Sequence, residues 1–205
     1  GDKALDDNQL EKVEILFSRR LHREPLAYIT EEKEFWSLPF KVSRDVLIPR
    51  PETELLIEIT LKTIKNQCGS PQEQTINILD LGTGSGIISV VLALELPAAA
   101  VTAIDLSYKA LKIAKHNAKR HKVAGRVQFI NCNWFGGISL KGKYDLVLAN
   151  PPYIARDILE KPFGQTCESL QPEVGGYEPH LALDGGERGI QSISRIAEDL
   201  EKTLK

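Results

Sequence analysis

The first fifty residues show a helical pattern followed by a short hairpin pattern. Residues 8–22 place apolar side chains on one helical face: Leu10, Val13, Leu16, Phe17 and Leu21. Residues 33–43 have the composition of a hairpin around Ser37-Leu38-Pro39. The N-terminal region is therefore expected to hold one amphipathic helix and two short strands.

A second helix is expected to begin at Pro51 and to end at about residue 66. Proline fits the first helical turn, and Glu52 and Glu54 favour the positive end of the helix dipole. The apolar positions of this helix include Leu55, Ile59 and Leu61. Residues 67–75 are polar and rich in turn formers, which predicts a linker.

From residue 76 onward, short apolar runs alternate with helical stretches. We expect strands at residues 76–81, 100–106, 127–131 and 144–149, and helices at residues 87–96 and 108–121. Strands that alternate with helices predict βαβ units and a parallel sheet. The predicted fold class is therefore α/β, with a doubly wound parallel sheet whose first four strands are present.

A long segment at residues 150–185 is rich in proline and glycine and has no clear periodicity. A connection of that length belongs to an active site more often than to a plain turn. A final helix is expected at about residues 187–203.

Composition narrows the class of protein. The chain has 205 residues, of which 42% are hydrophobic and 26% charged, as in one ordinary domain with a packed core. The net charge of −2 disfavours a globally basic nucleic-acid binder. No apolar run reaches the roughly 18 residues that a membrane span requires. We therefore expect no membrane association.

The cysteine and histidine spacings indicate neither disulfides nor a metal site. Cys68, Cys132 and Cys167 are odd in number and widely spaced, which fits a reducing, cytoplasmic setting. The four histidines lack the close spacing of ligands.

A glycine-rich loop follows the first of the predicted parallel strands. It reads Asp80-Leu81-Gly82-Thr83-Gly84-Ser85-Gly86. Glycines there permit a tight turn and let a ligand approach the backbone. A dinucleotide fingerprint would require glycine at position 87, where the chain has Ile87. An acidic residue before a Gly-x-Gly-x-Gly run is instead similar to the S-adenosylmethionine loop of methyltransferases. The alternative is a strand-to-helix turn without a ligand.

Two further positions are candidate nucleoside contacts. Asp105 ends the second parallel strand, where a carboxylate can accept hydrogen bonds from ribose hydroxyls. That contact does not distinguish S-adenosylmethionine from NAD, and Asp105 also suits a helix cap. Asn133 and Trp134 follow the third strand, and the indole could cover an adenine face or simply belong to the core.

The turn Asn150-Pro151-Pro152-Tyr153 follows the fourth strand. Two prolines fix the backbone and remove two donors, which leaves the Asn150 side-chain oxygen and the Pro151 carbonyl as acceptors. Tyr153 adds a flat ring. Such a turn suits a planar NH2 group held by two acceptors, and all four motifs lie at the carboxyl ends of strands, where parallel sheets bind ligands.

Together, these motifs resemble those of the HemK-type release-factor glutamine methyltransferases. The shared segments are Leu47-Ile48-Pro49-Arg50-Pro51-Glu52-Thr53-Glu54, Arg23-Glu24-Pro25, Tyr28-Ile29, Glu34-Phe35, Pro172-Glu173-Val174, Tyr177-Glu178-Pro179 and Ala182-Leu183-Asp184-Gly185-Gly186. The resemblance covers about residues 8–203 and implies a Rossmann-like, class I S-adenosylmethionine-dependent methyltransferase fold.

The resemblance implies an activity and a set of site residues. The expected reaction transfers a methyl group from S-adenosyl-L-methionine to N5 of the glutamine in the Gly-Gly-Gln motif of peptide chain release factors, leaving S-adenosyl-L-homocysteine. The implied cofactor contacts are Asp80, Gly82, Thr83, Gly84, Ser85, Gly86, Asp105, Asn133, Trp134 and Asn150. The implied substrate and catalytic residues are Asn150, Pro151, Pro152 and Tyr153.

The chain departs from the family pattern in two respects. Asn133 stands where the family usually has an acidic residue. The family also has a larger N-terminal helical domain and three more strands. We therefore expect residues 1–48 to be the end of that domain plus the hairpin, and residues 49–205 to be a methyltransferase domain that is incomplete at its C-terminus.

Two other functions remain open from the sequence. An adenine-N6 methyltransferase would use the Asn150 turn equally well on a flipped base, although the net negative charge and the lack of a target-recognition domain disfavour it. The second open function is that of a non-catalytic S-adenosylmethionine-binding module. A cytoplasmic monomer with release factors as partners is the expectation.

Overall fold

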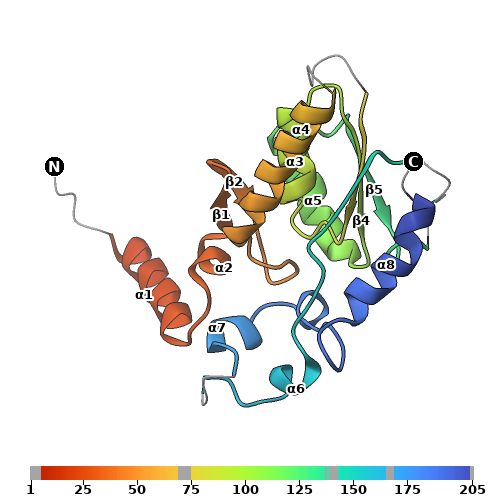
Figure 1. Cartoon of the computed structure of the whole chain (residues 1–205). Helices are drawn as coiled ribbons and strands as arrows, with labels where there is room; N and C mark the ends of the chain where they lie inside the picture. Colours follow the sequence, from red (N-terminus) through yellow and green to blue (C-terminus); the bar gives the residue numbers. More distant parts are fainter. Residues whose placement is uncertain (1–5, 69–74, 137, 139–142, 165–168, 204–205) are drawn as a thin grey trace.

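Four parallel strands form the central sheet of the computed structural model, which describes residues 6–68, 75–136, 138, 143–164 and 169–203 (Figure 1). Their order is β5-β4-β3-β6, with β3 at Asn77–Leu81, β4 at Ala100–Asp105, β5 at Val127–Asn131 and β6 at Leu146–Ala149. Every neighbouring pair is parallel. The predicted fold class and all four strands are confirmed. The predicted linker lies largely outside the described residues, and Cys167 lies wholly outside them.

Helices cover both faces of this sheet. They are α3 (Glu52–Cys68), α4 (Ile87–Glu95), α5 (Tyr108–Arg120) and α8 (Gln191–Thr203). Figure 1 shows α3, α4 and α5 on one side of the strands and α8 on the other. Ile78 of β3 packs among residues of α3, α4 and α5, whereas its neighbour Leu79 packs with Ile196 of α8. The two apolar layers follow from the alternation of side chains along a strand.

The buried face of α3 does not include Leu55 and Ile59, two of the apolar positions expected from the sequence. Ile57 and Ile64 are buried in the core, whereas Leu55 and Ile59 are 57% and 55% exposed. A helix buries the face that its neighbours cover, and α3 packs on α4 through the Ile57 stripe.

The N-terminal region contains α1 (Asp7–Leu21), α2 (Leu26–Thr30) and the hairpin of β1 (Glu32–Phe35) and β2 (Leu38–Lys41). The hairpin is confirmed, but its turn is Trp36-Ser37, one residue earlier than expected, and both residues have φ near +55°. The Trp36 amide donates to Glu54 Oε1 at 2.8 Å and its indole to Glu95 Oε1 at 2.8 Å. These bonds fix the turn in a strained conformation.

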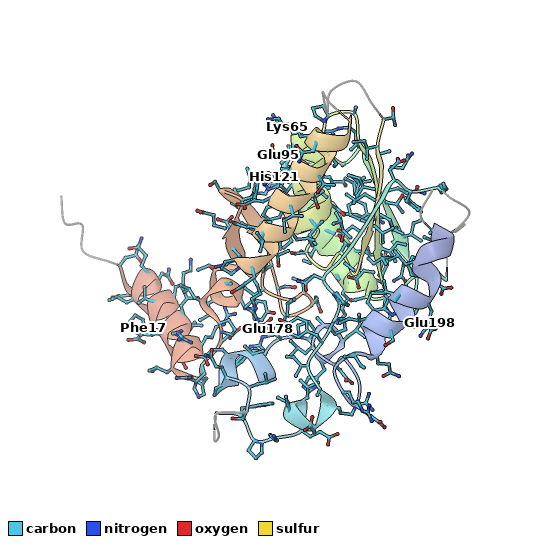
Figure 2. The ribbon with its side chains drawn as sticks, in the orientation of Figure 1. Phe17, Lys65, Glu95, His121, Glu178 and Glu198 are labelled. Atoms are coloured by element: carbon cyan, nitrogen blue, oxygen red, sulfur yellow. The ribbon has the colours of Figure 1, made fainter. Side chains whose placement is uncertain are left out.

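The apolar face of α1 is exposed. The helix is confirmed, and Asp6 caps it with a bond from the Gln9 amide at 2.8 Å. None of its side chains is buried by the part of the chain that the structure describes, and Figure 2 shows Phe17 on the outer side of the helix. No described helix is both long and apolar enough to cross a membrane.

The segment after β6 is more ordered than its sequence indicates. It contains the short helices α6 (Arg156–Leu159) and α7 (Pro172–Gly175) and the 3-10 turn η1 (His180–Ala182). The last helix begins at Gln191 rather than near residue 187, after Gly189 with φ +73°.

Candidate active site

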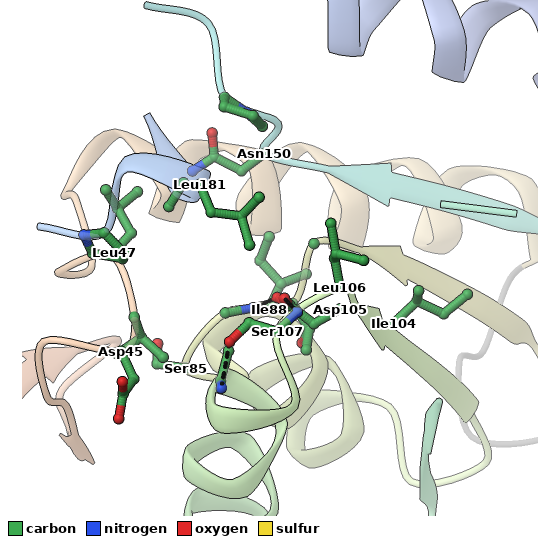
Figure 3. A pocket seen from close by; sticks show the side chains of 18 of the residues that line it. Asp45, Leu47, Ser85, Ile88, Ile104, Asp105, Leu106, Ser107, Asn150 and Leu181 are labelled. Atoms are coloured by element: carbon green, nitrogen blue, oxygen red, sulfur yellow. Dashed lines mark hydrogen bonds between the residues drawn. The ribbon is translucent and has the colours of Figure 1, made fainter. Parts of the chain in front are cut away.

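The loops that follow the four parallel strands meet at one edge of the sheet and enclose a cavity of about 230 Å³ (Figure 3). Its walls include Gly82, Thr83, Gly84 and Ser85 after β3, Asp105, Leu106 and Ser107 after β4, Cys132, Asn133 and Trp134 after β5, and Asn150 and Pro152 after β6. Figure 3 shows Asn150 and Leu181 across the cavity from Asp105 and Ser107. The structure therefore brings together four motifs that are spread over 70 residues of sequence.

Three amides of the glycine loop already have acceptors within the protein. Thr83 N–H donates to the Ile104 carbonyl, Gly84 N–H to the Asp105 carboxylate and Gly86 N–H to the Thr83 carbonyl, each at 2.8 Å. A phosphate at a helix N-terminus requires free amides of this kind, and the Asp105 carboxylate would repel it. The loop therefore fits a nucleoside without phosphates better than a dinucleotide.

Glycine is required in this loop for two different reasons. Gly82 and Gly86 have φ of +72° and +83°, where a side chain is strained. At Gly86 a Cβ would also lie 2.9 Å from the Cβ of Ala114. Gly86 thus lets α5 approach the loop closely and supports the cavity from behind rather than lining it.

Asp105 lies on the cavity wall, and both oxygens of its carboxylate accept hydrogen bonds from backbone amides. One oxygen accepts from Gly84 N–H and the other from Ser107 N–H, each at 2.8 Å. Burial raises the pKa of this carboxyl above its ordinary value. A carboxylate oxygen accepts more than one hydrogen bond, so each oxygen can still accept from a ligand hydroxyl.

Asp80 lies beneath the loop and is completely buried. Its Oδ2 accepts from the hydroxyls of Thr83 at 2.6 Å and Ser89 at 2.5 Å. Its Oδ1 finds no hydrogen-bond partner within the described ranges. Burial raises the pKa of Asp80 to about 6, against the opposing effect of the two hydroxyls. Asp80 therefore holds the loop and offers one unpaired acceptor below it.

Trp134 stands over the glycine loop. A Cβ built on Gly82 would lie 3.6 Å from the indole ring, and Trp134 has φ +48°, an uncommon conformation for a bulky residue. The ring packs against the core cluster on the α8 face and lines the cavity beside Asn133. It therefore belongs both to the core and to the cavity wall.

The Asn150 turn separates this cavity from a second one of about 270 Å³. Asn150 lines both, Pro152 lines the first, and Tyr153 lines the second with its side chain largely exposed. Pro151 lines neither of the two cavities described. The Asn150 Nδ2 donates to Thr53 Oγ1 at 3.4 Å.

Residues 183–189 hold the turn from behind. Ile154 N–H donates to the Leu183 carbonyl at 3.0 Å, and Gly185 N–H donates to the Ile154 carbonyl at 2.8 Å. A Cβ on Gly185 would lie 2.7 Å from Tyr153 Cα, and one on Gly189 would overlap the Tyr153 carbonyl oxygen. Gly185 and Gly189 thus allow two backbones to lie in direct contact. Gly186, the second glycine of the sequence motif, has φ +86°, where a side chain is strained.

Sequence reasoning missed three residues that organise the site. Arg50 and Thr53 line both cavities, and the buried carboxylate of Glu178 accepts from Arg50 at 2.5 Å and from the Ile48 amide at 3.2 Å. Burial raises the pKa of Glu178 despite the nearby guanidinium. All three residues lie in the segments that resemble the HemK-type family, and that was the only sign of their importance. The sequence around residue 50 does not indicate that it pairs with residue 178.

The residues present fit S-adenosylmethionine. The cavity combines apolar surface with a carboxylate at a strand end, and the loop amides are closed to phosphate. Within the described ranges, no group of three His, Cys, Asp or Glu side chains is placed to hold a metal ion. The fold and the site together define a class I S-adenosylmethionine-dependent methyltransferase.

Comparison with known proteins agrees with this class. The methyltransferase small domain family matches residues 53–167. The hMettl16 catalytic domain, solved in complex with an RNA hairpin, superimposes with a TM-score of 0.58 at 13% identity, over 95% of this chain and 75% of that one. That likeness supports the fold alone.

Two bacterial relatives are much closer in sequence. The release factor glutamine methyltransferase of Koribacter versatilis is 38% identical over all of this chain and 67% of its own length. The bifunctional methyltransferase of Rickettsia bellii is 42% identical over all of this chain and 39% of its own length. The chain belongs to the methyltransferase small domain family and, within it, to the release factor glutamine methyltransferases. It spans about two fifths of the length of the bifunctional relatives.

Proposed function

We propose that this chain transfers a methyl group from S-adenosylmethionine to the side-chain amide nitrogen of the glutamine in the Gly-Gly-Gln motif of peptide chain release factors. The observation that carries the proposal is the position of Asn150. It lies between a cavity that suits the cofactor and a second cavity that opens beside Tyr153. The name of the Koribacter relative supports the same substrate.

The cofactor side is assigned to the glycine loop and the residues around it. We propose that Gly82, Thr83, Gly84 and Ser85 surround the ligand, supported by Asp80 and Gly86 from behind. Asp105 accepts from the ribose hydroxyls, Trp134 covers the adenine face and Asn133 accepts from the adenine amino group. When bound, S-adenosylmethionine supplies a methyl group that its sulfonium has already activated.

The substrate side is assigned to Asn150, Pro151, Pro152 and Tyr153. An amide nitrogen is a poor nucleophile because its lone pair is delocalised. Asn150 Oδ1 and the Pro151 carbonyl accept its two N–H groups and so favour the positive charge that builds on nitrogen in the transition state. Tyr153 flanks the planar amide. The proton released from the methylated nitrogen goes to water or to Asn150, so a strong general base is not needed.

The chain's main contribution is then orientation. Holding the amide nitrogen at about 3 Å from the methyl carbon converts an encounter into a displacement within one complex, which can supply several kcal/mol. The rigid proline turn and the glycines behind it serve that purpose. We propose that the protein acts as a cytoplasmic monomer with release factors as its partners.

The test is methyl transfer from labelled S-adenosylmethionine with the whole protein. The substrates are a release factor, its Gly-Gly-Gln variant with Gln→Ala, and double-stranded DNA and RNA that contain adenine. We expect label on the release factor and none on its variant. Label on nucleic acid alone would assign the Asn150 turn to adenine, and bound cofactor without any transfer would favour a binding module.

A further inference from the structure

The two cavities share four residues: Leu47, Arg50, Thr53 and Asn150. Thr53 and Asn150 are joined side chain to side chain, because Asn150 Nδ2 donates to Thr53 Oγ1. The boundary is therefore where a group from the second cavity would reach a ligand in the first. Thr53 is not among the residues that the proposed function uses.

Thr53 is held firmly in place. It lies in the first turn of α3, its side chain is buried, and its amide donates to the Arg50 carbonyl at 3.0 Å. Arg50 is in turn paired with the buried carboxylate of Glu178. Figure 2 shows Glu178 between the N-terminal helices and α8.

The bond from Asn150 to Thr53 gives the two ends of the Asn150 amide different tasks. The Nδ2 group donates to the Thr53 hydroxyl at 3.4 Å. The Oδ1 atom is then left as an acceptor for another group. A threonine hydroxyl can donate as well as accept. In this structure it accepts from Nδ2 and so anchors that end of the amide.

We propose that Thr53 is a positioning residue for the methyl-transfer reaction: its hydroxyl anchors the Nδ2 end of the Asn150 amide, so that Oδ1 is held toward the N–H groups of the substrate. This inference rests on the proposed function. Without the hydroxyl, the partly buried Nδ2 group loses this partner, and the amide is no longer held in one orientation. When its NH2 group turns toward the cavity, donor meets donor at the substrate nitrogen.

The test compares three variants of the whole protein. Thr53→Val keeps the shape and removes the hydroxyl, and Thr53→Ser keeps the hydroxyl. Thr60→Val is the matched control, because Thr60 lies on the same helix, is equally buried and lines neither cavity. The measurements are kcat and KM for the release factor, the Kd for S-adenosylmethionine and the melting temperature.

We expect Thr53→Val to lower kcat by about 10-fold, because the loss of one hydrogen bond that positions a reacting group has an effect of that order. The Kd for S-adenosylmethionine should stay within about 3-fold, and Thr53→Ser should restore most of kcat. Thr60→Val should leave kcat unchanged. A normal kcat in Thr53→Val, an equal loss in Thr60→Val, or no rescue by serine would each overturn the inference.

Failure of the proposed function would look different. If the wild-type protein methylates only adenine, the release-factor assignment fails, while the same variants assayed on adenine still test whether Thr53 orients Asn150. If the wild-type protein methylates glutamine and Thr53→Val does so equally fast, only the role of Thr53 is wrong.

Discussion

The two sides of the site are built from different kinds of contact. The cofactor side stands on buried apolar strands and a loop that bonds to itself within about 25 residues, from Asp80 to Asp105. The substrate side joins segments that are farther apart in the sequence: Arg50 pairs with Glu178, which lies 128 residues later, and the Tyr153 backbone lies against Gly189 of the segment before α8. Local order thus forms the cofactor side, and long-range polar contacts complete the substrate side.

This difference has a physical consequence. A buried apolar layer stabilises in proportion to its area and tolerates small shifts of its parts. Ion pairs and bare backbone contacts depend on direction and distance, so one substitution displaces what they hold. We therefore expect changes on the substrate side to reduce turnover more than cofactor affinity. The predictions below test that contrast.

The largest effect is expected from Asn150→Ala. Losing the side-chain acceptor should lower turnover by about 100-fold, the size found when one group that stabilises transition-state charge is removed. Cofactor affinity should change little, because Asp105, Trp134 and the glycine loop remain. Single-turnover methyl transfer and equilibrium binding would separate the two. Lost binding with normal turnover would reverse the roles assigned to the two sides.

A smaller effect is expected from Glu178→Gln. The substitution leaves Arg50 without its buried carboxylate, at a cost of about 2 kcal/mol of unfolding free energy, less than for a fully buried pair because Arg50 is partly exposed. Glu173→Gln is the matched control. Its partners Arg20 and Arg23 are half exposed, so about 0.5 kcal/mol is expected. Urea unfolding of both variants measures the two losses of unfolding free energy. Equal losses would mean that the buried Arg50–Glu178 pair stabilises the protein no more than the exposed pairs of Glu173.

Gly189→Ala should destabilise the protein by about 1–2 kcal/mol, because Gly189 has φ +73° and a Cβ there would overlap the Tyr153 carbonyl. Turnover should fall with it, since the Asn150 turn is displaced. At Gly125 a Cβ meets no atom within 4 Å, so Gly125→Ala serves as the control. Unfolding and turnover are measured for both. A harmless Gly189→Ala would show that the backing segment does not hold the turn.

The same contrast explains what the sequence predicts and what it does not. The strands from Asn77 to Ala149 are found within about two residues of their predicted places, because short apolar runs bounded by glycine and proline encode them locally. The positions of Asp105, Trp134 and Asn150 at one edge follow from the rule that parallel strands end together.

The misses lie where distant segments meet. The exposure of Leu55 and the burial of Ile57 on α3 depend on which face α4 covers, which periodicity alone does not show. The partnership of Arg50 with Glu178 and the fit of Gly185 against Tyr153 have no local signal at all. Asp80 stays a predicted residue of the cofactor side, and the structure places it below the loop, where it accepts hydrogen bonds from two hydroxyls.

The smallest expected effect concerns pH, and two buried carboxyl groups, Asp80 and Glu24, differ in its sign. On the cofactor side, burial raises the pKa of Asp80 to about 6. Between its unfolded and folded pKa values the native state binds more protons than the unfolded state, so this group's contribution to stability falls as pH rises. In the N-terminal region, hydrogen bonds from Arg19 lower the pKa of Glu24 to about 2. Its contribution is present at neutral pH and is lost as pH falls below about 4.5.

Denaturant unfolding of the wild type, Asp80→Asn and Glu24→Gln between pH 3 and pH 7 tests both signs. From pH 5 to pH 7 the wild type should lose about 1 kcal/mol relative to Asp80→Asn, because only the wild type must ionise a buried carboxyl. From pH 5 to pH 3 the wild type should lose part of its advantage over Glu24→Gln, because the loss is complete only below the folded pKa of about 2. Parallel curves for Asp80→Asn would place the pKa of that carboxyl at its ordinary value. In that case a hydrogen-bond donor, such as a bound water, would satisfy Asp80 Oδ1. The hydrogen-bond network that holds the loop would then be complete.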